Sequence, residues 1–288
     1  MKTIILTTTL EQGNKLKDSI KFMNSEFSSI ENYTKNDILS DPSQFKDTLY
    51  IFSSWYMPIF SESEIEGYLP SLKAVFYAAG TVKYFATPFF NKGVRIFSSA
   101  TANAIPVAEF VTAQILLANK GYFQAQKEYR KPLWRFSFNK ARNYSYQKSG
   151  NYNARIGVIG CGAIGARVVK LLKPYHLEVL VYDPYLSDER IKELDVKRID
   201  LVDLFSTCDV ISNHLPNIDE TVGVINFKLL SLMKKNVTFI NTGRGQQVVE
   251  KDLVKIMQKK PNASALLDVT IKEPIRPWSK LLRLKNVF

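Results

Sequence analysis

The chain has 288 residues, a formal net charge of +12, two cysteines and 45% hydrophobic residues. This composition supplies a sizeable core and excludes disordered, collagen-like and disulfide-stapled proteins. The length fits two domains of ordinary size. No apolar run approaches the ~18 residues of a membrane span, the N-terminus lacks a signal peptide, and two distant cysteines suit a reducing compartment, so we expect a cytoplasmic protein.

The first hundred residues predict a small α/β domain. Short β-rich runs alternate with segments of weaker helical pattern, of which Gln12–Met23 is one. The predicted strands are Lys2–Thr7, Leu49–Ser53, Leu72–Ala78 and Arg95–Ser98. A strongly apolar helix is predicted over Ile105–Leu117, because Pro106 is tolerated in a first helical turn. We expect the first domain to span residues 1–101 and the second residues 102–288.

The second half predicts a doubly wound parallel sheet. Continuous apolar strands alternate with helical stretches, the pattern of βαβ units covered on both faces. The predicted strands are Ile156–Ile159, Glu178–Tyr182, Val210–Asn213, Val237–Asn241 and Ala265–Asp268. Between the first two strands, apolar residues recur at helical spacing from Ile164 to Leu172, which predicts the crossover helix.

A glycine motif, Gly160-x-Gly162-x-x-Gly165, directly follows the first of these strands. Glycines at this spacing allow a tight turn and a close approach of backbone to pyrophosphate, whereas the alternative is a simple glycine-rich turn. The next strand ends at Asp183, where a carboxylate accepts hydrogen bonds from the adenosine ribose. No Arg or Lys adjoins Asp183 in sequence, which favours NAD over NADP.

Several further motifs, in this order along the chain, resemble those of the D-isomer-specific 2-hydroxyacid dehydrogenase family. The resemblance covers roughly residues 50–288. The similar stretches are Ala78-Ala79-Gly80-Thr81-Val82, Asn103–Glu109, Ser212-Asn213-His214-Leu215-Pro216 with Thr221, Asn241-Thr242-Gly243-Arg244-Gly245, Leu267-Asp268-Val269 and Glu273-Pro274. The resemblance implies a Rossmann-type NAD domain and a smaller, flavodoxin-like α/β substrate domain.

The resemblance also implies an enzyme, an NAD-dependent oxidoreductase that transfers a hydride between NAD(H) and a small 2-keto or D-2-hydroxy acid. Arg244 then forks onto the substrate carboxylate and carbonyl, and the backbone N–H groups of Ala79 and Gly80 hold that carboxylate. Glu273 pairs with a histidine that protonates the substrate oxygen. The implied cofactor-binding residues are Gly160, Gly162, Ala163, Ile164, Gly165, Asp183, Leu215, Pro216, Thr221, Thr242, Gly243 and Asp268. No metal site is expected.

Two departures from the family pattern stand out. The family places its catalytic histidine a few residues beyond a stretch similar to Asn286-Val287-Phe288, so we expect the chain to be truncated before it, with an incomplete NAD domain. The alternative function is a catalytically silent, NAD-binding regulatory or degraded family member. We expect His214 to be structural and His176 to be solvated. The second departure is in the substrate loop, where many members carry an Asp in place of Lys83 or its neighbour. Trp55 and Met57 are equally compatible with pocket and core.

The positive charge is concentrated in two segments. Residues 120–155 carry nine Lys and Arg against one Glu, interleaved with aromatic residues, and residues 251–288 carry nine against three acidic residues. Cations among aromatics are typical of single-stranded nucleic-acid surfaces. The family resemblance instead implies a dimer arm, so we favour a homodimer through residues 103–155. The second segment is interpreted as a solvated face.

Overall fold

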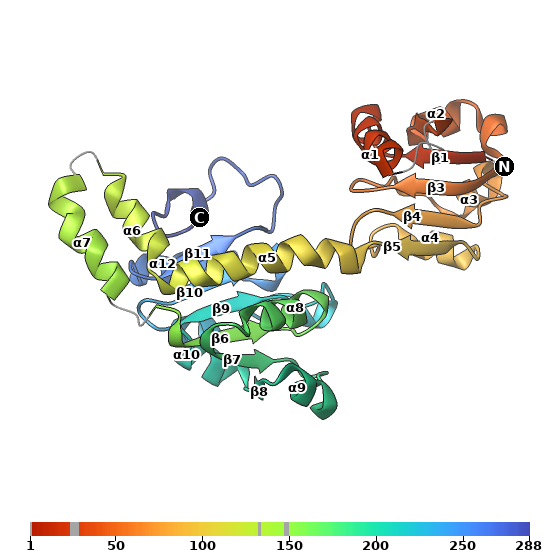
Figure 1. The fold of residues 1–288 in the computed structure, drawn as a ribbon. Coiled ribbons are helices and arrows are strands. Elements are labelled where there is room, and N and C mark those ends of the chain that lie inside the picture. Colours follow the sequence, from red (N-terminus) through yellow and green to blue (C-terminus); the bar gives the residue numbers. More distant parts are fainter. Residues whose placement is uncertain (1, 24–28, 132–133, 147–149) are drawn as a thin grey trace. The chain divides into compact units, whose positions relative to one another are not determined.

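The computed structural model describes residues 2–23, 29–131, 134–146 and 150–288 (Figure 1). The chain divides into two compact units, Met1–Asn103 and Ala104–Phe288. Each unit has a parallel sheet and a hydrophobic core of its own. The predicted class of two parallel α/β domains is confirmed.

The first unit contains a five-stranded sheet in the order β2-β1-β3-β4-β5, with every neighbouring pair parallel. The strands are β1 (Lys2–Leu6), β2 (Glu31–Tyr33), β3 (Thr48–Ser53), β4 (Ala74–Tyr77) and β5 (Arg95–Ser98). The helical elements are α1 (Leu10–Met23), α2 (Lys35–Ser40), η2 (Pro42–Phe45), α3 (Glu62–Tyr68) and α4 (Ala86–Asn91). The short helices α2 and α3 both begin at capping boxes, each of which pairs two backbone N–H groups at the helix start.

The sheet of the first unit has two different faces. Ile51, Val75 and Tyr77 point into a buried aliphatic and aromatic core that includes residues of α3 and α4. The other face carries a row of stacked rings, Phe52 on Phe76 at 5.1 Å and Phe76 on Phe97 at 5.2 Å between centroids. Aromatic pairs on neighbouring strands are a favourable cross-strand contact, so this row holds β3, β4 and β5 in register.

Three helices precede the second sheet: α5 (Ala100–Asn119), α6 (Tyr122–Tyr129) and α7 (Trp134–Tyr146). Among the described residues, α5 alone is long and apolar enough to cross a membrane, with 22% of its apolar window buried. One such helix is weak evidence for a span. Gly121 separates α5 from α6 with φ +67, and a Cβ there would lie 2.6 Å from the carbonyl oxygen of Tyr144, so only glycine fits this corner.

The second unit contains a six-stranded parallel sheet in the order β11-β10-β9-β6-β7-β8. The strands are β6 (Tyr152–Ile159), β7 (His176–Tyr182), β8 (Lys197–Arg198), β9 (Val210–Asn213), β10 (Thr238–Asn241) and β11 (Ser264–Leu267). The α-helices that follow α7 are α8 (Ala163–Leu172), α9 (Asp188–Leu194), α10 (Leu201–Thr207), α11 (Phe227–Leu232) and α12 (Glu250–Lys259).

Helices cover both faces of this sheet. Residues 108–118 of α5 share one core with α8 and α9, whereas α10, α11 and α12 share the other. Beyond β11, Val287 forms a parallel bridge with Ala265, and the N–H of Leu267 donates to the carbonyl oxygen of Phe288 at 2.9 Å. The sheet is therefore doubly wound, and the chain's last described residues lie along its β11 edge (Figure 1).

Candidate functional site

The predicted site residues of the second unit follow the carboxyl ends of its strands. β6 lies between β7 and β9, so the strand order reverses on the two sides of β6. In doubly wound sheets, ligands bind outside the carboxyl ends of the strands at such a reversal. Gly160 follows β6, Asp183 follows β7, and Asp268 follows β11. The turns that carry Leu215 and Arg244 follow β9 and β10.

The glycine loop is explained by the space around each glycine. Gly160 has φ +83, and a Cβ there would lie 2.8 Å from the carbonyl oxygen of His214, which places the loop against the turn after β9. A Cβ on Gly165 would lie 2.0 Å from the carbonyl oxygen of Gly160, so this glycine lets α8 pack on β6. Gly162 meets nothing within 4 Å and is the N-cap of α8. Open space at a helix N-terminus fits a phosphate group.

Ala163 and Ile164 form the first turn of α8, where the helix has no side-chain cap. Their N–H groups belong to the unsatisfied donors that every helix leaves at its start. Together with the open space at Gly162, these donors fit the pyrophosphate of a dinucleotide.

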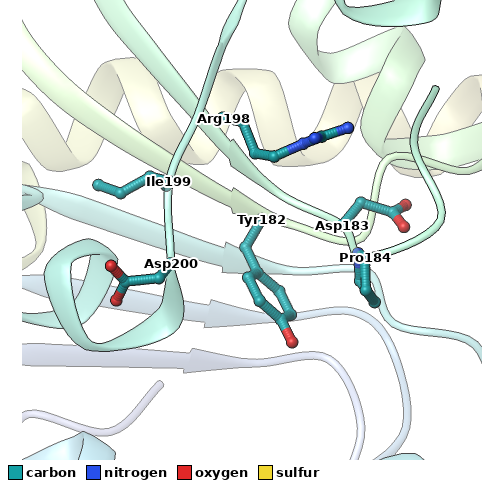
Figure 2. Close-up of a pocket in the computed structure, with 6 residues that line it drawn as sticks. All are labelled: Tyr182, Asp183, Pro184, Arg198, Ile199 and Asp200. Carbon is teal, nitrogen blue, oxygen red and sulfur yellow. The ribbon is translucent and has the colours of Figure 1, made fainter. Parts of the chain in front are cut away.

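Asp183 lies in a pocket of about 380 Å³ at the end of β7 (Figure 2). Its Oδ2 accepts from the N–H of Cys161 at 2.7 Å and its Oδ1 from the N–H of Tyr185 at 3.0 Å. A carboxylate has about four acceptor positions, so Asp183 retains capacity for two ribose hydroxyls. The six lining residues are Tyr182, Asp183, Pro184, Arg198, Ile199 and Asp200.

The pocket contains a cation that the sequence neighbourhood of Asp183 did not reveal. Arg198, at the end of β8, lines the same pocket, donates to the carbonyl oxygen of Leu186 and lies 3.4 Å from Asp188 Oδ1. The residues that adjoin Asp183 in sequence include no Arg or Lys. Arg198 reaches the pocket through the parallel pairing of β7 with β8, a two-residue strand that sequence periodicity does not detect.

His214 is buried in the turn after β9. Its Nε2 lies 2.9 Å from Ser212 Oγ and its Nδ1 lies 3.2 Å from Thr242 Oγ1. Burial lowers the pKa of His214 to about 3, so the ring is neutral at physiological pH. His214 therefore links two hydroxyl groups as a neutral imidazole, which is not the protonated form that a general acid needs. The other histidine, His176, is exposed. It begins β7 and so lies at the amino end of that strand, away from the carboxyl end that carries Asp183.

A buried amide cluster, consisting of Asn213, Asn241 and Gln247, lies beneath the two turns. Asn213 Nδ2 donates to Asn241 Oδ1 at 2.9 Å and to Gln247 Oε1 at 2.7 Å. Asn241 Oδ1 also accepts from the N–H of Gly243 at 3.2 Å. The sequence interpretation missed this cluster as a functional element. The only sequence signal is that the polar amides Asn213 and Asn241 end their strands, where apolar residues are otherwise expected.

Two segments at the ends of β10 and β11 pack directly on one another. A Cβ on Gly245 would lie 2.0 Å from the carbonyl carbon of Thr270. Glu250 Oε1 accepts from the N–H of Ile271 at 2.6 Å, and Glu273 Oε1 accepts from the N–H of Thr270 at 3.1 Å. The structure thus brings the turn that contains Arg244 next to the loop that contains Glu273.

Arg244 is half-buried, and its Nη1 donates to the carbonyl oxygen of Gly243 at 2.7 Å. Asp268 is exposed, and its N–H donates to the carbonyl oxygen of Asn241 at 3.1 Å. Thr221 is buried, and its Oγ1 donates to the carbonyl oxygen of Pro216 at 2.8 Å. Of these bonds, that of Asp268 ties the loop after β11 to the end of β10.

The predicted site residues of the first unit follow β4. Ala79 is buried, its carbonyl oxygen accepts from the N–H of Ser99 at 3.1 Å, and Ser98 Oγ donates to the carbonyl oxygen of Gly80 at 3.0 Å. Met57 belongs to the core with 2% of its surface exposed, whereas Trp55 is half exposed. The pocket interpretation is therefore excluded for Met57. No group of three or more metal-ligating side chains occurs among the described residues of either unit.

The geometry defines a dinucleotide-binding α/β domain, and comparisons with known proteins give its family. Residues 112–288 match the family model of the D-isomer specific 2-hydroxyacid dehydrogenase, NAD binding domain. The chain is 33% identical to the D-3-phosphoglycerate dehydrogenase of Archaeoglobus fulgidus over 197 residues, covering 68% of this chain and 36% of that protein. It is 29% identical to the glyoxylate reductase of Korarchaeum cryptofilum over 227 residues, covering 78% and 68%. The chain belongs to the D-isomer-specific 2-hydroxyacid dehydrogenase family.

Solved structures share the fold at lower identity. The NAD-dependent formate dehydrogenase of Staphylococcus aureus, in complex with NAD, superposes with a TM-score of 0.72 at 22% identity, covering 100% of this chain and 87% of that one. The D-mandelate dehydrogenase of Rhodotorula graminis gives a TM-score of 0.77 at 20% identity, covering 99% and 86%. The prediction of an NAD-binding domain is confirmed by the family model.

Proposed function

We propose that this protein transfers a hydride between NAD(H) and a small 2-keto or D-2-hydroxy acid. One observation carries the proposal: the open space at Gly162 and the half-buried side chain of Arg244 both lie at the carboxyl ends of the strands of one parallel sheet. The first fits a dinucleotide and the second fits a carboxylate. The chain spans 36% of the length of the A. fulgidus relative.

The residues of the second unit fit NAD. The open N-terminus of α8 faces the pyrophosphate position, and Asp183 has acceptor capacity left for the adenosine ribose. Asp268 is exposed and available to accept from a carboxamide. When bound, the nicotinamide supplies or receives the hydride. The remaining proposed cofactor contacts come from Leu215, Pro216, Thr221, Thr242 and Gly243.

In this proposal Arg244 binds the keto acid through its planar fork of donors. The backbone N–H groups of Ala79 and Gly80 are the proposed carboxylate donors of the first unit. Glu273 is exposed and is proposed to hold a proton donor at the site, a role that neither His214 nor His176 fills. General acid catalysis contributes roughly 10²–10⁴ in rate, so the proton source decides the turnover number.

A catalytically silent NAD-binding regulator is the second candidate. It is favoured by the positions of His214 and His176, neither of which suits proton transfer to a substrate. His214 is buried and neutral, and His176 lies at the amino end of β7. Arg244 and Glu273 count against it, since a protein that only binds NAD needs neither.

One experiment separates the two candidates. NADH binding is measured by fluorescence, and NADH oxidation is followed with glyoxylate, pyruvate or hydroxypyruvate, for the unaltered chain and for Arg244→Ala. The dehydrogenase proposal expects keto-acid-dependent oxidation that Arg244→Ala lowers at least a hundredfold while NADH binding persists, since a charged hydrogen bond is worth about 1.5–3 kcal/mol and a bidentate one more. NADH binding without turnover on any keto acid supports the silent regulator.

We also propose a cytoplasmic homodimer that binds no nucleic acid and no membrane. Exposed aromatic residues on α6 and α7 support a protein interface, Phe136 being 74% and Tyr146 67% exposed. The side chains of Trp134 and Arg135, and Lys148 as a whole, lie outside the described residues.

Both cysteines are free and buried, which suits a reducing compartment. Light scattering tests the dimer, which Phe136→Glu should weaken, and a salt-sensitive shift of single-stranded DNA would contradict the absence of nucleic-acid binding.

A further inference from the structure

The amide of Gln247 uses its full hydrogen-bonding capacity within the protein. Gln247 ends η4 (Gly245–Gln247), and none of its surface is exposed. Its Oε1 accepts from Asn213 Nδ2 at 2.7 Å and from the N–H of Arg244 at 3.0 Å. Its Nε2 donates to the carbonyl oxygens of Leu215 and Pro216, both at 2.9 Å. A glutamine amide has two donors and two acceptor positions, so nothing remains for a ligand.

These four bonds join two turns beyond the point where their strands stop pairing. The ladder between β9 and β10 ends at Asn213 opposite Asn241. Past that pair, Gln247 connects the N–H of Arg244 to the carbonyl oxygens of the Leu215-Pro216 turn. The bonds lie in a buried, low-dielectric environment, where their loss costs more than it would in water.

The glycine before Arg244 fits the same arrangement. A Cβ on Gly243 would lie 2.4 Å from Gln247 Oε1 and 2.9 Å from Asn213 Nδ2. Gly243 therefore lets its turn close over the amide cluster. The closure brings Arg244 within reach of Gln247.

We propose that Gln247 is a positioning residue for Arg244. It fixes the backbone from which the guanidinium group extends relative to the Leu215-Pro216 turn, and so sets where a substrate carboxylate is held beside the cofactor. The role rests on the proposed function, in which Arg244 binds the keto acid. A binding group works only if it is held to well within 1 Å of its productive position. A residue that fixes the backbone of Arg244 therefore controls substrate affinity without touching the substrate.

The matched variants are Gln247→Met and Gln246→Met in the full chain. Methionine keeps the length of Gln247 and removes all four bonds, whereas Gln246 is the exposed neighbour of the same residue type. Amide hydrogen exchange by NMR reports on the Arg244 N–H directly. We expect it to exchange at least tenfold faster in Gln247→Met and at the unaltered rate in Gln246→Met. Unchanged exchange in Gln247→Met overturns the proposal. If Gln247→Met does not fold, Gln247→Asn is measured instead, because it keeps the amide but is one methylene too short.

A double-mutant cycle tests the link to Arg244. Oxamate, an unreactive isostere of pyruvate, is titrated into the NADH-saturated chain carrying Gln247→Met, Arg244→Ala or both. We expect Gln247→Met to weaken oxamate at least tenfold and NADH less than threefold, and to add less than twofold in the Arg244→Ala background. Additive losses of oxamate affinity contradict a role through Arg244. If the unaltered chain neither binds oxamate nor oxidises NADH, the proposed function fails, while the exchange rate of Arg244 still decides whether Gln247 holds the turn.

Discussion

The two halves of the second sheet treat their polar groups in opposite ways. On the β7 and β8 side, Asp183 and Arg198 line an open pocket, and the carboxylate of Asp183 is only partly used by backbone donors. On the β9 and β10 side, Gln247 and Asn213 are fully buried, and the amide of Gln247 is saturated. The first arrangement leaves capacity for a ligand, whereas the second fixes backbone geometry.

This difference separates recognition from positioning. A change on the open side alters which cofactor is preferred and is expected to cost the fold less, because Asp183 is only half-buried and Arg198 is exposed. A change on the saturated side leaves buried donors or acceptors unpaired, at about 1–3 kcal/mol for each group. The glycine loop lies between the two sides, since Gly160 follows β6 and would contact the carbonyl oxygen of His214 if it carried a Cβ.

The largest effect is expected for Gly165→Ala, which disrupts the boundary between the two sides. Its Cβ would lie 2.0 Å from the backbone oxygen of Gly160, and backbone cannot move aside as a flexible side chain can. We expect a loss of about 3 kcal/mol in the free energy of unfolding, at the upper end of overpacking penalties. Urea denaturation measures it. A loss below about 0.5 kcal/mol, the ordinary range for surface changes, would show that α8 does not pack on β6 as described.

The next effect is a pH dependence on the saturated side. The pKa of His214 is lowered by burial to about 3, from 6.5 in an unfolded chain. Between these values the unfolded state binds a proton that the folded state does not. The free energy of unfolding is therefore unaffected by His214 above pH 6.5. Below that it decreases by about 1.4 kcal/mol per pH unit as the pH falls toward 3. Urea denaturation at pH 7.5, 6 and 4.5 follows it.

The control for this pH dependence is His214→Gln, which removes one titrating group and leaves His176 in place. The unaltered chain should lose more stability than the variant between pH 6 and pH 4.5. Parallel pH profiles for the two chains would mean that His214 is solvated or protonated in the folded protein.

The apolar strands of both sheets were predictable because a run of apolar residues is visible in the sequence itself. Val210–Asn213 and Arg95–Ser98 were predicted with the bounds observed. The short strands β2 and β8 were missed, since two or three largely polar residues carry no period. The strands β6 and β7 also begin earlier than predicted, at Tyr152 and His176.

The site residues divide along a similar line. Gly160 and Asp183 were predicted from local turn and strand chemistry, and Arg244 and Glu273 from a family resemblance. Gln247 and Arg198 have no local signal, because their partners lie on other strands. Gln247 bonds to Asn213, and Arg198 reaches the Asp183 pocket through strand pairing. Such contacts can be recognised only once the order of the strands in the sheet is known.

A smaller effect on stability but a clear one on binding is expected for Gly162→Ala. Nothing lies within 4 Å of its added Cβ, so the free energy of unfolding should stay within about 0.5 kcal/mol. The methyl group fills the space proposed for a phosphate, so the Kd for NADH should rise on the order of 30-fold, the loss of one or two charged hydrogen bonds. Calorimetry measures the Kd. Unchanged NADH affinity would place the pyrophosphate elsewhere.

The smallest effect is expected on the open side, in the choice between NADH and NADPH. Asp183→Ser should raise the Kd for NADH by about tenfold, the value of a charged hydrogen bond to ribose hydroxyls. The Kd for NADPH should fall, because the substitution removes a negative charge beside the 2′-phosphate and leaves Arg198 in the same pocket. Adding Arg198→Ala should reverse the gain for NADPH by about threefold, as expected for an exposed charge pair, without a further loss for NADH. Equal losses for both cofactors in Asp183→Ser would contradict the proposed contact of Asp183 with the ribose. An unchanged NADPH affinity on adding Arg198→Ala would restrict Arg198 to its bonds with Leu186 and Asp188.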